Sequence, residues 1–126
     1  MKLLIPIKPV AKGRPRTRVV RTGKKVFATF YTDSKTRQFE EAVYSYCVAN
    51  KINITKDVPL EIYIEFNFIK PKSSKNIYHI VKPDIDNLCK SLLDGMKIKD
   101  ENVVFLSARK YYEKVESIYI EIKEII

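Results

Sequence analysis

The strictest constraint in the sequence is the alternation within "VPLEIYIEFNFIKP", residues 58–71. Apolar side chains occupy every second position, and mainly polar ones fill the positions between them: Ile62, Ile64, Phe66 and Phe68 against Glu61, Tyr63, Glu65 and Asn67. Because successive side chains of a strand point to opposite faces, this pattern predicts a strand with one face buried against a core.

The rest of the chain divides into further short elements around that strand. "KLLIPIK" and the two C-terminal stretches "VVFLSARKYYE" and "VESIYIEIKEI" read as strands, and "RTGKK" supplies a turn between "TRVV" and "KVFATFY", which predicts a β-hairpin. Apolar residues at helical spacing predict one helix from about Ser34 to Asn50 and a second over "NLCKSLLDGM". We therefore expect an α+β fold, a small mixed β-sheet with two main helices on one face.

Length and composition limit what this fold can be. A chain of 126 residues predicts a single domain over residues 1–126. The apolar start is too short for a signal-peptide core or a membrane span, so we expect a cytoplasmic protein with no membrane contact. Cys47 and Cys89 both lie in segments of helical spacing, which favours buried thiols over a disulfide. No Cys pair or Cys/His cluster is present to bind zinc.

The charge is strongly positive and unevenly placed. Lys and Arg number 24 against 15 Asp and Glu, a net charge of +9. Seven of these cations fall in one stretch without an acid: Lys12, Arg14, Arg16, Arg18, Arg21, Lys24 and Lys25. Such a block is typical of nucleic-acid binding, and its arginines suit phosphate because a guanidinium can contact two oxygens. A basic surface loop that serves solubility is the alternative.

Against this background, "VKPDIDNLCKSLLDGMKIKDENVV", residues 81–104, gathers five acidic side chains. If the chain is extended at Asp84-Ile85-Asp86, the two carboxylates face the same side and Ile85 points toward the core. Two like charges at about 5 Å repel by about 3 kcal/mol at an effective dielectric of about 20. A hard divalent cation would offset this repulsion. The alternative is that Asp86 is a helix N-cap and Asp84 a solvated neighbour.

Four more charged candidates lie downstream of this pair. Lys90 and Asp94 follow Asp86 at i+4 and i+8, so the helix places all three on one side. There Lys90 can stabilise charge on a phosphate or pair with Asp94. Asp100 and Glu101 lie just before the next strand. The simplest interpretation is that they belong to an ordinary turn. They can lie beside Asp84 only if the strand order of the sheet places that strand there.

These motifs together resemble a known family. "KPDIDNLCKSLLDGM" followed by "KDENVV", with "KGRPR" and "ATFYTDSKTRQFEEAV" upstream, is similar to the RusA-like Holliday-junction resolvases, small homodimeric, magnesium-dependent endonucleases that are often encoded in prophages. The resemblance covers most of the chain.

The resemblance implies a function and a set of site residues. It assigns Asp84, Asp86 and Lys90 to catalysis together with a third acid at Glu101, where the family has Asp, and it leaves open whether Asp100 or Glu101 is the third metal ligand. It implies Mg²⁺, with Mn²⁺ as a substitute and no organic cofactor, held by Asp84, Asp86 and this third acid. Branched DNA is the implied substrate, contacted by the basic stretch and Lys82, and a homodimer would supply two cuts.

Two alternatives to this function remain at the level of sequence. One is a DNA-junction-binding protein of the same fold without catalysis, and the other is a small metal-dependent ribonuclease. His79, the only histidine, lies in a polar stretch without a partner acid or thiol, so we expect a surface or DNA-facing position rather than a general base. We expect Asp33 to cap the first helix and Glu40 to lie on its surface.

Overall fold

The computed structural model describes residues 1–54 and 57–125. Its elements in chain order are β1 (Lys2–Ile5), β2 (Arg16–Thr22), β3 (Lys25–Tyr31), α1 (Ser34–Ala49), β4 (Leu60–Ile69), α2 (Ile85–Gly95), the short 3-10 helix η1 (Asp100–Asn102), β5 (Val103–Glu113) and β6 (Ser117–Glu124). Within these described ranges, no helix combines the length and apolar character that crossing a bilayer requires.

Four strands form one mixed sheet in the order β1-β6-β4-β5. β4 pairs with β5 in parallel and with β6 antiparallel, and β6 also pairs antiparallel with β1. The alternating segment from the sequence is thus an interior strand, whose apolar residues Ile62, Ile64 and Phe66 are fully buried. The parallel β4–β5 pair requires a crossover, which α2 supplies.

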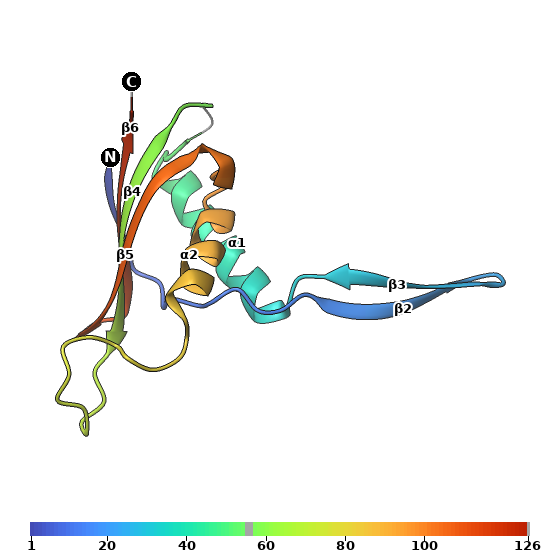
Figure 1. Ribbon diagram of the computed structural model, residues 1–126, viewed down its shortest axis with the longest axis horizontal. Coiled ribbons are helices and arrows are strands. Elements are labelled where there is room, and N and C mark those ends of the chain that lie inside the picture. The colour runs from blue at the N-terminus through green and yellow to red at the C-terminus, as the bar shows by residue number, and fades with distance from the viewer. Residues whose placement is uncertain (55–56, 126) are drawn as a thin grey trace.

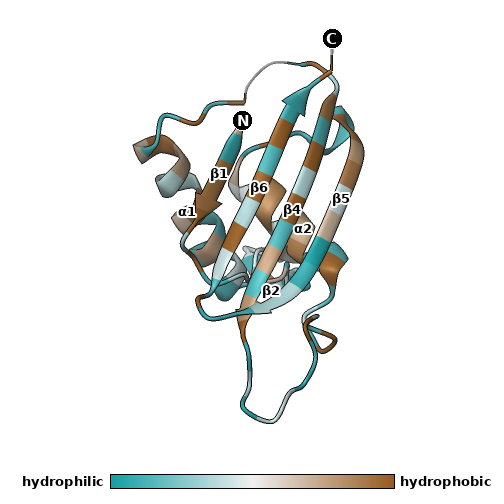
Figure 2. Cartoon of the chain, turned by 90° about the vertical axis from the view of Figure 1, so that its left-hand side faces the viewer, coloured by the Kyte–Doolittle hydropathy of each residue, from teal (hydrophilic) through white to brown (hydrophobic). Residues whose placement is uncertain are grey.

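Both helices cover the same face of this sheet, and the other face is open (Figures 1 and 2). α1 and α2 pack on each other at Gly95, where an added Cβ would lie 3.1 Å from the Cβ of Val43. The core lies between this helical layer and the sheet, so the predicted α+β architecture with two helices on one face is confirmed. Asp33 caps α1 as predicted, since its carboxylate accepts a hydrogen bond from the Thr36 amide.

β2 and β3 form a separate two-stranded sheet that projects from the body as a long arm (Figure 1). Their register pairs Arg16 with Tyr31 at the root and Thr22 with Lys25 at the tip. Gly23 takes a positive φ of 62° in the tip turn, a conformation that glycine adopts without strain. The predicted hairpin is confirmed, and we call residues 16–31 the basic arm.

Two local predictions about the acidic segment were wrong. α2 begins at Ile85, with Asp84 as its N-cap residue, so the chain is not extended through Asp86. Asp86 therefore lies in the first turn and is not the N-cap. Ile85 is 36% exposed instead of pointing to the core, because it lies in the first turn of α2 and not in an extended segment.

Candidate active site

The first turn of α2 presents two exposed carboxylates. Asp84 is the N-cap residue but its side chain makes no capping hydrogen bond, and Asp86 follows in the first turn. The helix dipole places partial positive charge at this end, which favours carboxylates and also phosphate oxygens. This arrangement lowers the repulsion between the two acids and leaves their oxygens accessible from solvent.

Close basic groups accompany the first of these acids. Lys82 Nζ lies 2.9 Å from both carboxylate oxygens of Asp84. The Lys82 side chain is 84% exposed, so this ion pair is screened by water and contributes little to stability. For Asp86, one oxygen accepts a hydrogen bond from the Asn87 amide.

Lys110 holds the segment that leads into Asp84, and the sequence did not single it out. From β5, its Nζ donates to the carbonyl oxygens of Val81 and Pro83, both at 2.8 Å. The Lys82–Pro83 peptide bond is cis. Burial is the largest influence and lowers the pKa of Lys110. The negative charge of Asp84 raises this pKa, and the positive charge of Lys82 lowers it further. Lys110 therefore positions the segment before Asp84. Its place inside a predicted strand gave no signal of this role.

His79 is buried, which corrects the expected surface or DNA-facing position. Its ring stacks on Phe68 at a centroid distance of 4.0 Å and meets the edge of Tyr112 at 5.2 Å. The His79 amide also donates to the Lys110 carbonyl oxygen, so the segment around it runs along β5. Burial and the nearby Lys110 charge lower the pKa of the imidazole. His79 is a packing residue. Its polar sequence neighbours led to the wrong prediction that it is exposed.

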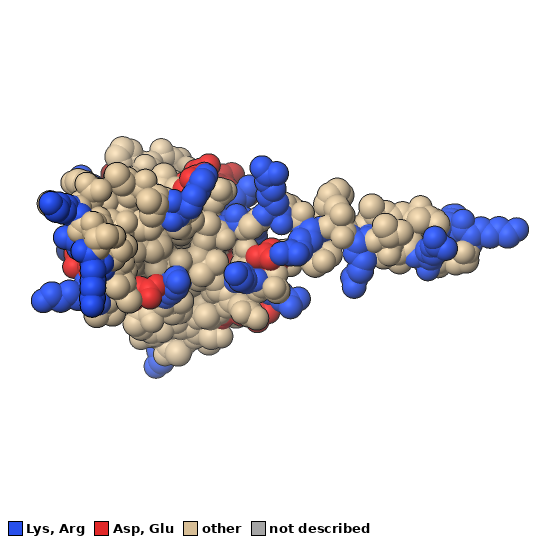
Figure 3. Space-filling view, turned by 90° about the horizontal axis from the view of Figure 1, so that it is seen from below, with Lys and Arg blue, Asp and Glu red and all other residues tan. Residues whose placement is uncertain are grey.

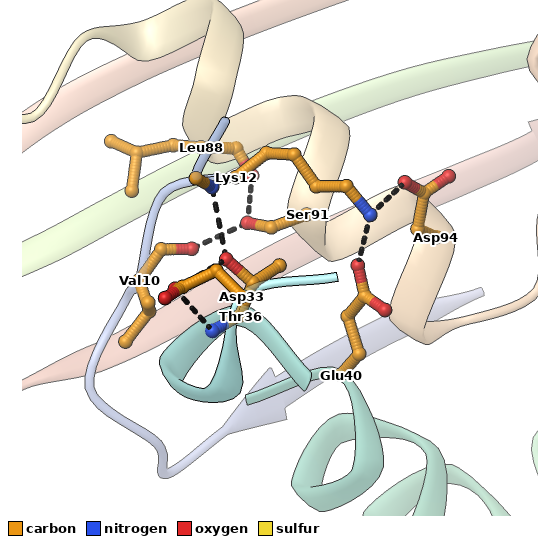
Figure 4. A network of polar contacts seen from close by, with 9 residues as sticks. Val10, Lys12, Asp33, Thr36, Glu40, Leu88, Ser91 and Asp94 are labelled. Atoms are coloured by element: carbon orange, nitrogen blue, oxygen red, sulfur yellow. Dashed lines mark hydrogen bonds and ion pairs between the residues drawn. The ribbon is translucent and has the colours of Figure 1, made fainter. Parts of the chain in front are cut away.

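Lys90 and Asp94 do not pair with each other. Asp94 instead lies 3.1 Å from the ammonium of Lys12, which also contacts Glu40 at 2.7 Å (Figure 4). Lys90 is exposed one turn beyond Asp86, and among the described residues it has no ion-pair partner. The predicted alternative of a Lys90–Asp94 pair is therefore not formed, and the Lys90 ammonium is accessible to an external anion.

Asp100 and Glu101 lie in η1, beyond the far end of α2 from Asp84 and Asp86 (Figure 1). The 11 residues of α2 separate the two acidic pairs by about 16 Å along its axis. In the ranges the structure describes, no three His, Cys, Asp or Glu side chains are grouped closely enough to hold a metal ion. One chain therefore does not bring the four predicted metal ligands together.

Part of that predicted set does suit a hard cation. Mg²⁺ takes oxygen ligands and commonly uses one or two carboxylates with substrate phosphates and water instead of an all-protein cage. The exposed carboxylates of Asp84 and Asp86 at a helix N-terminus match this chemistry. Among the described residues, no third carboxylate of the same chain lies close enough to join them.

The predicted DNA-contacting cations divide into paired and unpaired groups. Lys12 is occupied by Glu40 and Asp94, Arg16 lies 3.2 Å from Asp33, and Lys82 contacts Asp84. Arg18 stacks over the Tyr31 ring at 5.6 Å. The others are exposed along the approach to the basic arm and toward its tip, where Figure 3 shows blue side chains and no red ones: Arg14, Arg21, Lys24 and Lys25.

A short strap fixes the root of the arm beside the first turn of α2. The Lys12 amide donates to the Asn87 carbonyl oxygen at 2.9 Å, and the Gly13 amide donates to Thr36 Oγ1 at 2.9 Å. Ser91 Oγ donates to the Val10 carbonyl oxygen (Figure 4). A Cβ on residue 13 would lie 3.1 Å from an Asp33 carboxylate oxygen, so glycine permits this close approach. Carboxylates and basic arm thus have a defined relative placement.

The sequence matches one protein family over nearly its whole length. A sequence profile described as Endodeoxyribonuclease RusA matches residues 6–123. The chain belongs to this family. A relative from Lactococcus phage r1t, named Crossover junction endodeoxyribonuclease rusA, is 37% identical over 76 residues, covering 56% of this chain and 58% of the relative. The chain thus matches little more than half the length of that RusA relative. The resemblance inferred from the motifs is confirmed.

Burial of His79 generates a pH prediction. The pKa of His79 in the folded protein lies below its ordinary value of 6.5. As the pH falls below that value, the unfolded chain takes up a proton that the folded chain does not, so the folded state loses stability. In His79→Phe, which keeps a ring against Phe68, we expect the free energy of unfolding to decline less between pH 7 and pH 5.

Urea unfolding at a series of pH values measures this difference directly. Other groups titrate alike in both proteins, so the difference between the two curves isolates His79. Parallel curves for wild type and His79→Phe would contradict the assignment.

Proposed function

We propose that this chain is a structure-selective endodeoxyribonuclease that cuts four-way DNA junctions by metal-assisted phosphodiester hydrolysis. The observation that carries the proposal is the pair of exposed carboxylates on the first turn of α2, beside the root of a projecting basic arm, in a chain of the RusA family. The name of the phage relative supports the junction as substrate.

The chain's own residues divide the work between binding and chemistry. The basic arm and the nearby arginine Arg14 contact the DNA backbone, while the helix N-terminus at Asp84 receives a phosphate. Asp84 and Asp86 would hold a divalent ion, Mg²⁺ or Mn²⁺, which would polarise the scissile phosphate and activate a water for attack. Binding of the ion by Asp84 would require Lys82 to give up its ion pair with this carboxylate. A DNA phosphate would then supply Lys82 with another negatively charged partner. Lys90, one turn further along, stabilises negative charge as the phosphodiester is attacked.

The separation of the acids along α2 bears on the oligomeric state. A third carboxylate from η1 reaches Asp84 and Asp86 only if a second copy provides it, because the two pairs lie at opposite ends of α2 in one chain. A homodimer also supplies the two equivalent sites that paired cuts in opposed strands require. We therefore propose the homodimer as the active form.

Cleavage of a labelled synthetic four-way junction tests the function. We expect nicks at the junction that depend on Mg²⁺ or Mn²⁺, and a loss of at least about 100-fold in rate for Asp86→Asn while junction binding persists, since only the chemical step loses its ligand. Glu41→Gln, the same carboxylate-to-amide change on the exposed surface of α1, is the matched control and retains activity.

Linear DNA duplex and single-stranded RNA are assayed beside the junction. Binding of the junction without cleavage under any metal condition would leave a non-catalytic junction-binding protein, and preferential cleavage of RNA would indicate a ribonuclease. Either outcome would refute the proposed reaction.

The basic arm predicts a defined salt dependence. Lys24 lies in the tip turn, and loss of one phosphate contact lowers the slope of log affinity against log salt concentration by about 0.9. We expect Lys24→Gln to show this reduction in titrations of fluorescent junction DNA. Lys123→Gln, an exposed lysine near the end of β6 away from the arm, is the control and keeps the wild-type slope. An unchanged slope for Lys24→Gln would mean that the arm tip does not contact DNA.

A further inference from the structure

The basic arm has two unlike faces. Residues that pair directly across two strands point to the same side of the sheet, so the register assigns each side chain of the arm to one face. One face holds three of the arm's cations, Arg16, Arg18 and Lys25. The other, which we call the apolar face, consists of Thr17, Val19, Arg21, Val26, Ala28 and Phe30. The arm is therefore amphipathic.

The apolar face is open to solvent. Phe30, Val19 and Val26 are 74%, 67% and 60% exposed, and the arm projects away from the body of the molecule (Figure 1). The cationic face is partly covered by its own side chains, since Arg18 lies over the Tyr31 ring. Because apolar surface gains free energy when it leaves water, we expect the apolar face to be covered in the working complex.

The charge of the arm limits what can cover this face. Residues 14–32 contain six cations and no acid. A second copy of the chain has a net charge of +9 and the same basic arm, so electrostatic repulsion opposes its approach. A polyanion is attracted instead. Nucleic acid is a polyanion that also offers apolar surface, in the planes of its bases.

Base planes are accessible only in some DNA structures. Inside a continuous duplex the bases are stacked on one another, and the grooves present mainly hydrogen-bonding edges. On the apolar face, only Thr17 and Arg21 have side chains that can bond to such edges. At a branch point the stacking is interrupted, and an aromatic side chain can stack on a base of any identity. The apolar face thus fits a branch point better than a groove.

We propose that the apolar face packs against bases that are unstacked at a branch point, with Phe30 stacked on one of them, and that this contact makes the protein prefer branched to continuous DNA. The inference rests on the proposed nuclease function for its purpose and names the residue that recognises the branch. Phe30 pairs with Thr17, next to the pair Arg16–Tyr31 at the root. The strap holds that root beside the first turn of α2, so the branch is bound at the end of the arm nearest the carboxylates.

Affinities for matched DNAs test the contact. Fluorescence anisotropy is measured in EDTA, which prevents metal-dependent cleavage, with a four-way junction and with a linear duplex of the same sequence. We expect Phe30→Ala to weaken junction binding about 10-fold, as loss of one base-stacking contact does, and to change duplex binding by less than about twofold. Phe30 is 74% exposed, so the variant retains its fold, which circular dichroism verifies. Equal losses on both DNAs, or no loss on either, overturn the proposal.

Two further variants separate stacking from the folding of the arm. Phe30→Tyr keeps an aromatic plane and is expected to keep the preference for the junction. Phe27→Ala removes the same kind of side chain from the opposite face of β3, and the ratio of junction to duplex affinity is expected to stay at its wild-type value. A ratio that falls as far in Phe27→Ala as in Phe30→Ala means that arm folding sets the preference, which overturns the proposal.

Photocrosslinking locates the contact on the DNA. In one junction 5-iodouracil replaces a thymine at the branch point, and in a second it replaces a thymine in the middle of a helix. Long-wavelength ultraviolet light couples iodouracil to an aromatic side chain that stacks on it. We expect the branch-point base to crosslink to Phe30 and the mid-helix base to give no such product. Equal crosslinking of Phe30 at both positions contradicts the assignment.

Sedimentation without DNA tests the other possible occupant of the apolar face. Wild type and Phe30→Ala are expected to have the same association state, and a difference would mean that a second copy covers the face, which overturns the proposal. None of these readouts requires cleavage. A junction that is bound through Phe30 but never cut refutes the nuclease function alone, whereas a junction that is cut and is indifferent to Phe30→Ala refutes this inference alone.

Discussion

The ammonium of Lys12, held between Glu40 of α1 and Asp94 of α2, is the contact on which the arrangement of the site depends. Burial alone lowers the pKa of Lys12, but its hydrogen bonds to the two carboxylates outweigh that and raise it, so the group stays charged. The same residue donates its amide to Asn87 in the first turn of α2. One short segment thus joins both helices, and the basic arm begins immediately after it.

This strap relates the two parts of the proposed chemistry. A projecting hairpin has little to stabilise it alone, because isolated two-stranded sheets are marginal in water. Anchoring its root through Lys12 and Gly13 sets where a bound backbone passes relative to Asp84 and Asp86. In the proposed function, binding and hydrolysis are then properties of one unit, with the arm placing the phosphate and the helix N-terminus receiving it.

Much of the fold could be predicted from the sequence, because the periodicity of apolar residues indicates which face of a helix or strand is buried. The alternation around Ile64 gave the central strand, and helical spacing around Phe39 and Leu92 gave both helices. The wrong predictions concern residues whose burial depends on tertiary contacts. Ile85 was read as buried because the start of α2 was placed two residues late, and His79 was read as exposed because its stacking partner Phe68 belongs to a distant strand.

The site was only partly predictable for a related reason. The motif predicted Asp84, Asp86 and Lys90 as site residues, but sequence separation does not reveal that the intervening helix α2 holds Glu101 away from them. Lys110 carried no signal because its role is a pair of hydrogen bonds to loop carbonyls. In the proposed homodimer, a second copy would return Glu101 to the motif.

The central claim is that each active site takes residues from two chains, and a mixed dimer tests it most directly. One chain carries Asp84→Asn and Asp86→Asn, the other Asp100→Asn and Glu101→Gln, and two affinity tags isolate the mixed species. Each variant alone has no complete site and is expected to leave the four-way junction uncut. The mixed dimer has one complete site and is expected to nick the junction in a metal-dependent reaction. A mixed dimer as inactive as its parents, beside a wild type that cuts, would contradict the account.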